Sequence, residues 1–354
     1  MGRSLKSGWI RLVCVGVGMA GAAVWVACAT VALSAQAGGQ ANAPGANATS
    51  IADSLLLPDS SKPTFTIPQA ALHDPVTMVA YGDMRFTDPR ETTETDPKIR
   101  VEVVKRVAAE RPGVLLLGGD VPLYGGSRSD YAEFADETRV WREQNLRVFP
   151  VLGNHEFYGC DPARCLENWW HAFPYLTGRR WYSVRVGNSI EAIALDSDDS
   201  LEPGSRQAEW LARQVNALPR EMEFVFIMLH HPPVADENPG PTASHNVRPN
   251  EEALRDYLRT KSAARRTNFI VIAAHIHNYE RFFENGVTYL VSGGGGAMPY
   301  PVIRRADDLF KSSDFPNYHY VKFVLRDKTL SATMYRRSSV GAWQAMDRFR
   351  IAYR

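Results

Sequence analysis

Residues 269–277 read FIVIAAHIH, an apolar run followed at once by two histidines. The run is short and rich in Phe, Ile and Val, which is typical of a strand buried on both faces of a sheet. Six similar runs occupy residues 76–81, 114–117, 148–152, 192–195, 224–229 and 287–291. Amphipathic stretches at 98–110, 207–218 and 251–259 lie between several of them. Strands that alternate with helices at this spacing predict an α/β fold.

The chain beyond Gly293 has a different pattern. Residues 318–325, 330–335 and 349–353 predict further strands joined by hairpins. They would form either added antiparallel strands or a second sheet.

Polar residues follow five of the seven apolar runs. They are Asp83, Asp120, Asn154 with His155, His230 with His231, and His275 with His277. Because the loops at the carboxyl ends of strands in an α/β sheet converge on one crevice, we expect these side chains to meet. Each alone has an ordinary interpretation, as a turn residue, a helix cap, a core histidine or an exposed histidine pair. Five such placements together favour a functional site.

The composition limits the classes of protein to consider. The 354 residues are 45% hydrophobic, which is enough for one large core and fits one domain near the upper size limit. The formal net charge is +1, and without the first 37 residues it would be about −2. The sequence therefore gives no strong nucleic-acid signal, and no feature identifies a protein partner.

The N-terminus has the pattern of an export signal. Arg3, Lys6 and Arg11 precede an uncharged, mostly apolar run over 12–33, and an A-x-A pattern ends at Ala37. Residues 1–37 are therefore expected to be a cleaved signal peptide, an uncleaved membrane anchor, or a segment with a lipid attached at Cys28. Each alternative makes the protein periplasmic or secreted, and the last two imply N-terminal membrane attachment.

Two further features agree with export. Residues 38–68 are rich in Ala, Gly, Asn, Ser and Pro, which predicts a flexible linker ahead of a folded domain at 69–354. Cys160 and Cys165 lie five residues apart, and an exported pair at this spacing favours a local disulfide over a metal site. The remaining alternative is two free, buried thiols.

Five ordered motifs resemble those of the calcineurin-like metallophosphoesterase superfamily. They are GD at 82–83, GGD at 118–120, GNHE at 153–156, HHPP at 230–233 and HIHNYER at 275–281. The last motif is especially similar to purple acid phosphatases and their bacterial relatives, as are residues 207–211 and 289–297. The likeness covers roughly residues 72–325. It implies a four-layer α/β/β/α sandwich of two mixed β-sheets flanked by helices, with 69–354 as the catalytic domain.

The resemblance also implies a centre of two divalent or trivalent metal ions, with Fe, Zn or Mn as candidates. Asp83 and His277 would hold the first ion, and Asp120 would bridge both. The second ion would be completed by Asn154, His230 and His275. His155 would face the substrate without binding metal, and His231 would lie behind the ligands.

Two positions depart from the family pattern. Arg85 stands where the common Asp-x-His motif has its histidine, and a guanidinium cannot bind a metal. Purple acid phosphatases have a tyrosine three residues after the bridging aspartate, where this chain has Leu123, with Tyr124 one residue further on. The first ion would therefore lack a ligand, or Tyr124 would reach it through an altered turn.

Arg85 would either bind a phosphate oxygen or turn outward to a surface carboxylate such as Asp88. The glycines at 293–296 would cradle phosphate or form a turn beside the site.

The expected reaction is hydrolysis of a small phosphate ester by in-line attack of metal-bound hydroxide. Two metal ions neutralise the ester and lower the pKa of a bound water from 15.7 to about 7, while His155 assists the leaving group. One alternative is a phosphodiesterase, nucleotidase, nuclease or other esterase on the same scaffold. Another is a non-catalytic secreted binding module in which the metals only stabilise the fold.

Overall fold

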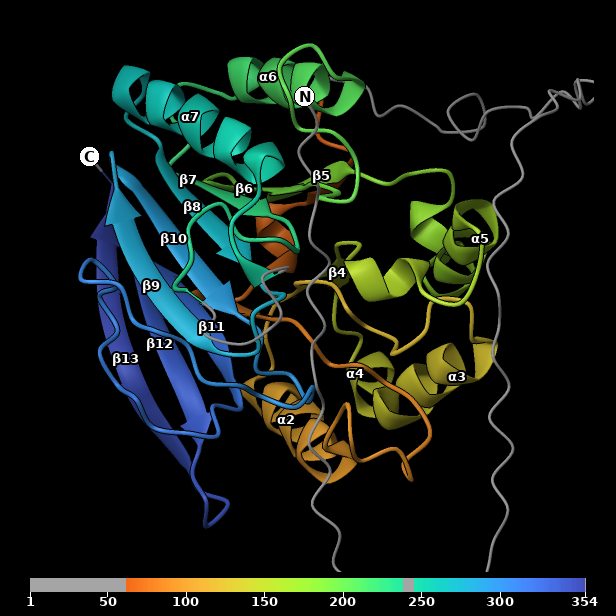
Figure 1. Cartoon of the computed structure of the whole chain (residues 1–354). Coiled ribbons are helices and arrows are strands. Elements are labelled where there is room, and N and C mark those ends of the chain that lie inside the picture. Colours follow the sequence, from red (N-terminus) through yellow and green to blue (C-terminus); the bar gives the residue numbers. More distant parts are fainter. Residues whose placement is uncertain (1–61, 238–244, 354) are drawn as a thin grey trace, which may run out of the picture. The chain divides into compact units, whose positions relative to one another are not determined.

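Two β-sheets pack face to face in the computed structural model, which describes residues 62–237 and 245–353 (Figure 1). The seven-stranded sheet has the order β1 (Phe65–Ile67), β5 (Tyr182–Val186), β6 (Ile190–Ala194), β7 (Phe224–Met228), β8 (Asn268–Ala273), β10 (Val287–Ser292) and β9 (Tyr279–Glu284). The six-stranded sheet has the order β13 (Trp343–Ala352), β12 (Thr329–Arg337), β11 (His319–Arg326), β2 (Val76–Tyr81), β3 (Val114–Leu117) and β4 (Val148–Pro150). Both sheets are mixed, with parallel runs over β6–β7–β8–β10 and β2–β3–β4.

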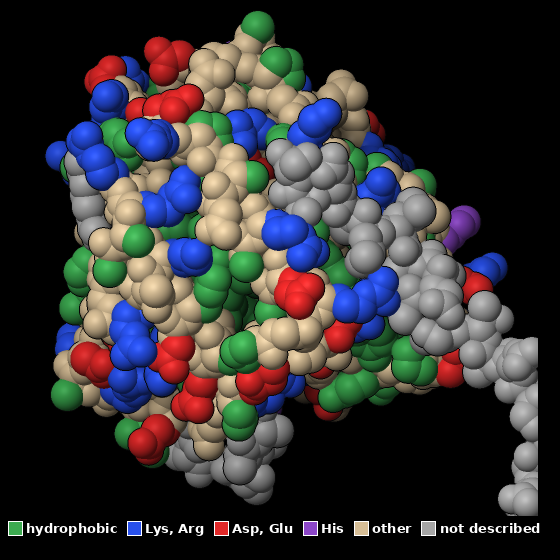
Figure 2. Space-filling view, turned by 90° about the horizontal axis from the view of Figure 1, so that it is seen from above, with side chains coloured by type: hydrophobic (Ala, Val, Ile, Leu, Met, Phe, Trp, Pro, Cys, Tyr) green, Lys and Arg blue, Asp and Glu red, His purple; other side chains and the backbone are tan. Residues whose placement is uncertain are grey.

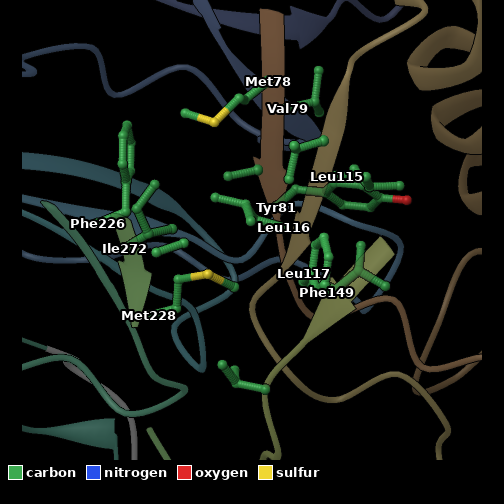
Figure 3. Close-up of a cluster of buried hydrophobic side chains, with 14 of the residues drawn as sticks. Met78, Val79, Tyr81, Leu115, Leu116, Leu117, Phe149, Phe226, Met228 and Ile272 are labelled. Atoms are coloured by element: carbon green, nitrogen blue, oxygen red, sulfur yellow. The ribbon is translucent and has the colours of Figure 1, made fainter. Parts of the chain in front are cut away.

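The central strands, such as β3, β7 and β8, are almost entirely apolar because both of their faces are covered. Phe226 and Met228 of β7 lie in the core between the sheets, together with Met78 and Leu116 from the other sheet (Figure 3). The alternate β7 residues, such as Ile227, belong to a second core with α6 (Arg206–Ala217) and α7 (Pro249–Ala264). Successive side chains of a strand point to opposite faces, so burial of both faces requires a continuous apolar run.

Other helices lie on the outer side of the six-stranded sheet. They are α2 (Pro97–Glu110), α3 (Arg128–Glu137), α4 (Arg139–Glu143) and α5 (Pro162–Ala172). Short 3-10 helices occur at Gln69–Ala71 (η1), Asn154–Phe157 (η2) and Pro174–Leu176 (η3). The Trp141 ring of α4 packs edge-on against Tyr81 of β2, and its indole N–H donates to the Val104 carbonyl of α2. The layers are thus helix, sheet, sheet, helix, which confirms the predicted four-layer α/β sandwich.

The seven predicted apolar runs coincide with β2, β3, β4, β6, β7, β8 and β10. The three later segments form β11, β12 and β13, which extend the β2 sheet in antiparallel fashion, the first of the two alternatives. The predicted linker boundary at residue 68 is too late, because Phe65–Ile67 pairs with β5 as an edge strand and Ile67 is buried. Three residues are too few for their alternation to be recognised in a sequence.

The N-terminal expectations concern another part of the chain. The predicted export segment 1–37 and most of the linker lie outside the described residues. Within 62–237 and 245–353, none of the helices combines the length and hydrophobicity that crossing a membrane requires.

Candidate metal centre

Every expected ligand residue follows the carboxyl end of a strand. Asp83 follows β2, Asp120 follows β3, Asn154 follows β4, His230 follows β7, and His275 with His277 follows β8. The backbone turns sharply at several of these points, because Asp83, Asp120 and His275 have positive φ angles of 58°, 53° and 67°. A left-handed backbone conformation costs a non-glycine residue roughly 1–3 kcal/mol, and such residues cluster at functional sites.

Asp83, Asp120 and His277 form a first group of potential ligands. One ligand atom from each lies within 4.8 Å of the others, and all three residues are buried. Both Asp83 oxygens, Asp120 Oδ2 and His277 Nε2 are buried without a hydrogen-bond partner among the described residues. His277 Nδ1 lies 2.7 Å from the Met298 carbonyl and must donate to it, which leaves the Nε2 lone pair free. Since buried unpaired polar atoms are costly, this donor set fits a bound cation.

Asn154, His230 and His275 form a second group beside the first. Asn154 Oδ1 lies 3.0 Å from His230 Nε2 and 3.1 Å from His275 Nδ1. His230 Nδ1 donates to the Gly118 carbonyl over 2.8 Å, so its Nε2 is the nitrogen that carries the lone pair. That Nε2 lies 3.2 Å from Asp120 Oδ1. Asp120 therefore touches both groups, as a carboxylate shared by two ions would.

The electrostatics of the site favour positive charge. Burial, reinforced by the Asp120 carboxylate, raises the pKa of Asp83 well above its usual value. Burial opposes ionisation of Asp120 as well, but His230, His155 and Arg85 together hold its pKa below the usual range. Burial lowers the pKa of both His230 and His277, so each imidazole is neutral near pH 7 and able to bind a metal.

The calcineurin-like phosphoesterase family model matches residues 97–279, more than half of the chain. This chain belongs to the calcineurin-like phosphoesterase family. A search of curated proteins found no match.

Two solved structures are similar to this calcineurin-like phosphoesterase. One is purple acid phosphatase PPD1 from yellow lupin (Lupinus luteus) seeds, with 19% identity and a TM-score of 0.63. The match covers 81% of this chain but only 55% of the lupin chain. The other is GAP50, the anchor in the inner membrane complex of Plasmodium, with 13% identity and a TM-score of 0.53 over 79% of this chain and 89% of that one. At these identities the likeness concerns the fold alone.

In this phosphoesterase His155 lies next to the ligand groups. Its Nδ1 donates to the Leu123 carbonyl over 2.7 Å, and its backbone N–H donates to Asp120 Oδ1 over 3.0 Å. Its Nε2 remains 3.8 Å from Asp120 Oδ2. Burial lowers the pKa of His155, and the Asp120 charge partly offsets this effect. The ring thus presents one nitrogen to the site from a fixed direction.

Arg85 points into the site. Its Nη2 lies 3.5 Å from Asp120 Oδ2, and its Nη1 donates to Glu94 over 3.2 Å. Arg85 does not pair with Asp88, which is bound to Arg90. It does pair with another surface carboxylate, Glu94, while its second terminal nitrogen lies beside the buried Asp120.

The other predicted site residues lie at the edge of the two groups. The Tyr124 ring is about half exposed, and its backbone N–H donates to Asp130, while metal ligation by its phenol stays a prediction. His231 Nδ1 lies 2.8 Å from Ser197 Oγ, and its ring packs 4.1 Å from that of His275. His231 therefore supports His275 from behind. A disulfide joins Cys160 and Cys165, whose Cα atoms are 5.7 Å apart.

Backbone hydrogen bonds fix the shape of two segments beside the ligand groups, 275–278 and the glycine run at 293–296. The segment from His275 to His277 is bent, because the N–H groups of Ile276 and Asn278 each donate to the carbonyl two residues earlier. The glycine run packs beneath the site, since the N–H groups of Gly293 and Gly295 donate to protein carbonyls and are not available to phosphate. A side chain at Gly293 would collide with Asp83 Oδ2.

Glu156 is a supporting residue that the sequence reasoning missed. Its Oε2 accepts from the N–H groups of Gly153 and Asp120 over 2.6 and 3.0 Å, and its Oε1 accepts from that of Val121 over 2.8 Å. It thereby ties the loop after β3 to the loop after β4. Its position at the end of the GNHE motif was the sequence feature that could have indicated this supporting role.

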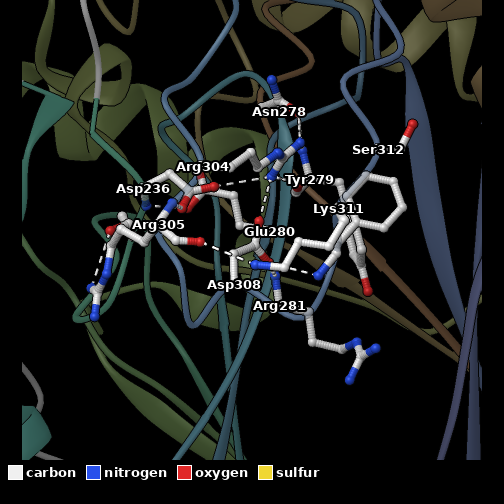
Figure 4. Close-up of polar contacts among 12 residues, drawn as sticks. Asp236, Asn278, Tyr279, Glu280, Arg281, Arg304, Arg305, Asp308, Lys311 and Ser312 are labelled. Carbon is white, nitrogen blue, oxygen red and sulfur yellow. Dashed lines mark hydrogen bonds and ion pairs between the residues drawn. The ribbon is translucent and has the colours of Figure 1, made fainter.

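A polar cluster around Arg304 supports the segment after His277 (Figure 4). The Arg304 guanidinium donates to Asn278 Oδ1 over 3.1 Å, to Asp236 over 3.0 Å and to Asp308 over 2.8 Å. Asn278 in turn donates to the Tyr300 carbonyl over 3.0 Å. Asp236 and Asn278 lie 68 and 26 residues from Arg304 in the sequence, so no local pattern could have predicted that they meet there.

Proposed function

We propose that this chain is an exported phosphoesterase that hydrolyses a small phosphate ester at a centre of two metal ions. The observation that carries the proposal is the position of Asp120. This carboxylate lies between two groups of buried ligand atoms, and several of those atoms find no partner within the described residues. Asp83 and His277 would hold one ion with Asp120.

The second ion would be held by Asp120 with Asn154, His230 and His275. The donor set consists of oxygens and imidazoles, which suits Fe, Zn or Mn. When bound, the two ions would neutralise the ester and supply a water of lowered pKa.

His155 and Arg85 would act on the substrate. His155 Nε2 would assist the departing oxygen, because its other nitrogen is fixed to the Leu123 carbonyl. Such proton transfer typically contributes 10²–10⁴-fold to a rate. The Arg85 guanidinium, oriented by Glu94 and Asp120, would donate to a non-bridging phosphate oxygen.

The export part of the proposal rests on the N-terminal pattern of Arg3, Lys6 and Arg11 before an apolar run. The disulfide between Cys160 and Cys165 supports it, since disulfides persist in oxidising compartments. N-terminal sequencing of the mature protein tests it. A new N-terminus just after Ala37 is expected, and recovery of the intact N-terminus from the cytoplasm would contradict export.

The charge on the surface bears on the class of ester. Lys and Arg side chains are interspersed with Asp and Glu over the face shown in Figure 2. A mixed surface gives a polynucleotide little general attraction, which favours a small substrate.

The proposed reaction is tested by loading the purified protein with Zn, Mn or Fe and supplying phenyl phosphate, bis(4-nitrophenyl) phosphate and a nucleoside monophosphate. At least one ester should be hydrolysed, and the activity should disappear with chelator and return with metal. Asp120→Asn should abolish it, whereas Asp136→Asn, an exposed change on α3, should not. A protein that binds metal but cleaves no ester would instead be a binding module.

A further inference from the structure

Tyr158 is held firmly although much of it faces solvent. Its hydroxyl accepts a 3.0 Å hydrogen bond from Asn154 Nδ2, and its ring packs 4.4 Å from the His155 ring. Its carbonyl accepts from the Gly126 N–H over 2.8 Å. The residue is nevertheless 45% exposed. Scattered exposed aromatic residues are common, but one fixed at its hydroxyl, ring and backbone is ordered in a single position.

In the structure the Asn154 amide turns its nitrogen to Tyr158. With Nδ2 directed at the Tyr158 hydroxyl, Oδ1 faces His230 and His275. Tyr158 is therefore a positioning residue for an expected metal ligand.

Tyr124 lies at the same edge of the site. The segment around it runs beside the segment around Tyr158, with the Gly125 N–H donating to the His155 carbonyl over 2.8 Å. A side chain at Gly125 would collide with the backbone of Glu156, so the close approach depends on this glycine. Tyr124 is 48% exposed, and its ring lies against Gly159, the residue after Tyr158.

We propose that the Tyr158 ring, flanked by Tyr124, is a platform for an aromatic leaving group, so that the preferred ester carries a flat ring next to its phosphate. This inference rests on the proposed function, because it places the leaving group beside His155. The Tyr158 ring is the exposed surface in contact with the His155 ring. A group attached through the departing oxygen would therefore lie over Tyr158, and an aromatic group would stack there.

The test compares ligands with and without a ring. Phenylphosphonate and methylphosphonate are titrated calorimetrically into the protein at saturating metal, for wild type, Tyr158→Leu, Tyr158→Phe and Phe283→Leu. Phe283 is an exposed aromatic residue on β9 and serves as the matched control. Tyr158→Leu should weaken phenylphosphonate about tenfold and leave methylphosphonate within twofold, because it loses the ring, while saturating metal offsets the loss of the bond to Asn154 that it shares with Tyr158→Phe. Tyr158→Phe should keep the preference for the ring but bind metal more weakly, since it loses the bond to Asn154.

Steady-state kinetics provide the second readout. In Tyr158→Leu the ratio of kcat/KM for phenyl phosphate over glycerol 2-phosphate should fall about tenfold, and Phe283→Leu should not change it. The inference is overturned if Tyr158→Leu leaves the preference of binding and turnover unchanged, or if it weakens both phosphonates equally. If the wild type shows the ring preference in binding but hydrolyses neither ester, the proposed function fails while the platform stands.

Discussion

Replacement of Arg85 by Ala is expected to weaken phosphate ester binding without loss of the fold. In the structure the guanidinium contacts Glu94, which is largely exposed, and lies 3.5 Å from the buried Asp120. The exposed contact is worth under about 1 kcal/mol. A charge-assisted hydrogen bond to a phosphate oxygen is worth roughly 1.5–3 kcal/mol, so its loss should raise KM about ten- to more than a hundredfold.

The assay is steady-state kinetics with phenyl phosphate at saturating metal. Arg90→Ala is the matched control, because Arg90 lies on the same loop but is exposed and bound to Asp88. Calorimetric metal titration adds a second readout, since loss of a cation beside Asp120 should tighten the first ion. Arg85→His should tighten it further by supplying an imidazole next to Asp83. If Arg85→Ala leaves both KM and kcat unchanged, the guanidinium does not bind phosphate.

Three further outcomes are expected. His155→Ala should retain both metals but lose roughly 10²-fold or more in kcat, whereas His275→Ala should lose metal together with activity; metal loss from the first variant would contradict its placement. Cys160 and Cys165 should give no free thiols in the exported protein under denaturing, non-reducing conditions, and two free thiols would exclude the disulfide. Burial lowers the pKa of His319 to about 4, so the unfolded chain takes up a proton below about pH 6.5 while the folded chain does not. The contribution of His319 to the free energy of unfolding should thus be fully present above about pH 6.5 and fall by about 2.5 kcal/mol between pH 7 and 4.5, so urea titrations of His319→Gln should show a loss smaller by this amount than that of the wild type.

The strands were predictable where both faces are buried. The apolar run of β8 continues through Ala273, because its two faces pack on the other sheet and on the outer helices. The edge strand β9 was not predicted, because Glu280 and Arg281 interrupt its apolar pattern. The buried Glu280 carboxylate accepts a hydrogen bond from the Asp236 N–H, a distant partner that the local sequence does not indicate. The helix α3 was also missed, because few of its residues are buried.

The site was predictable where a ligand directly follows a strand, as Asp120 follows β3. The direction of Arg85 could not be predicted, because it depends on a carboxylate 35 residues away and on a left-handed turn with φ of 50°. The hydrogen bond between Asn154 and Tyr158 could not be predicted either, because sequence spacing does not show which exposed tyrosine is held by a hydrogen bond.

The metal content of the purified protein tests most directly that Asp120 is shared by two ions. Elemental mass spectrometry after saturation with Zn, Mn or Fe and removal of excess metal should find two ions per wild-type chain. Asp120→Asn should retain less than one, because both groups of ligands lose a common carboxylate, and Asp136→Asn should retain two. A wild type that binds at most one ion, or an Asp120→Asn variant that keeps two, would contradict the shared centre.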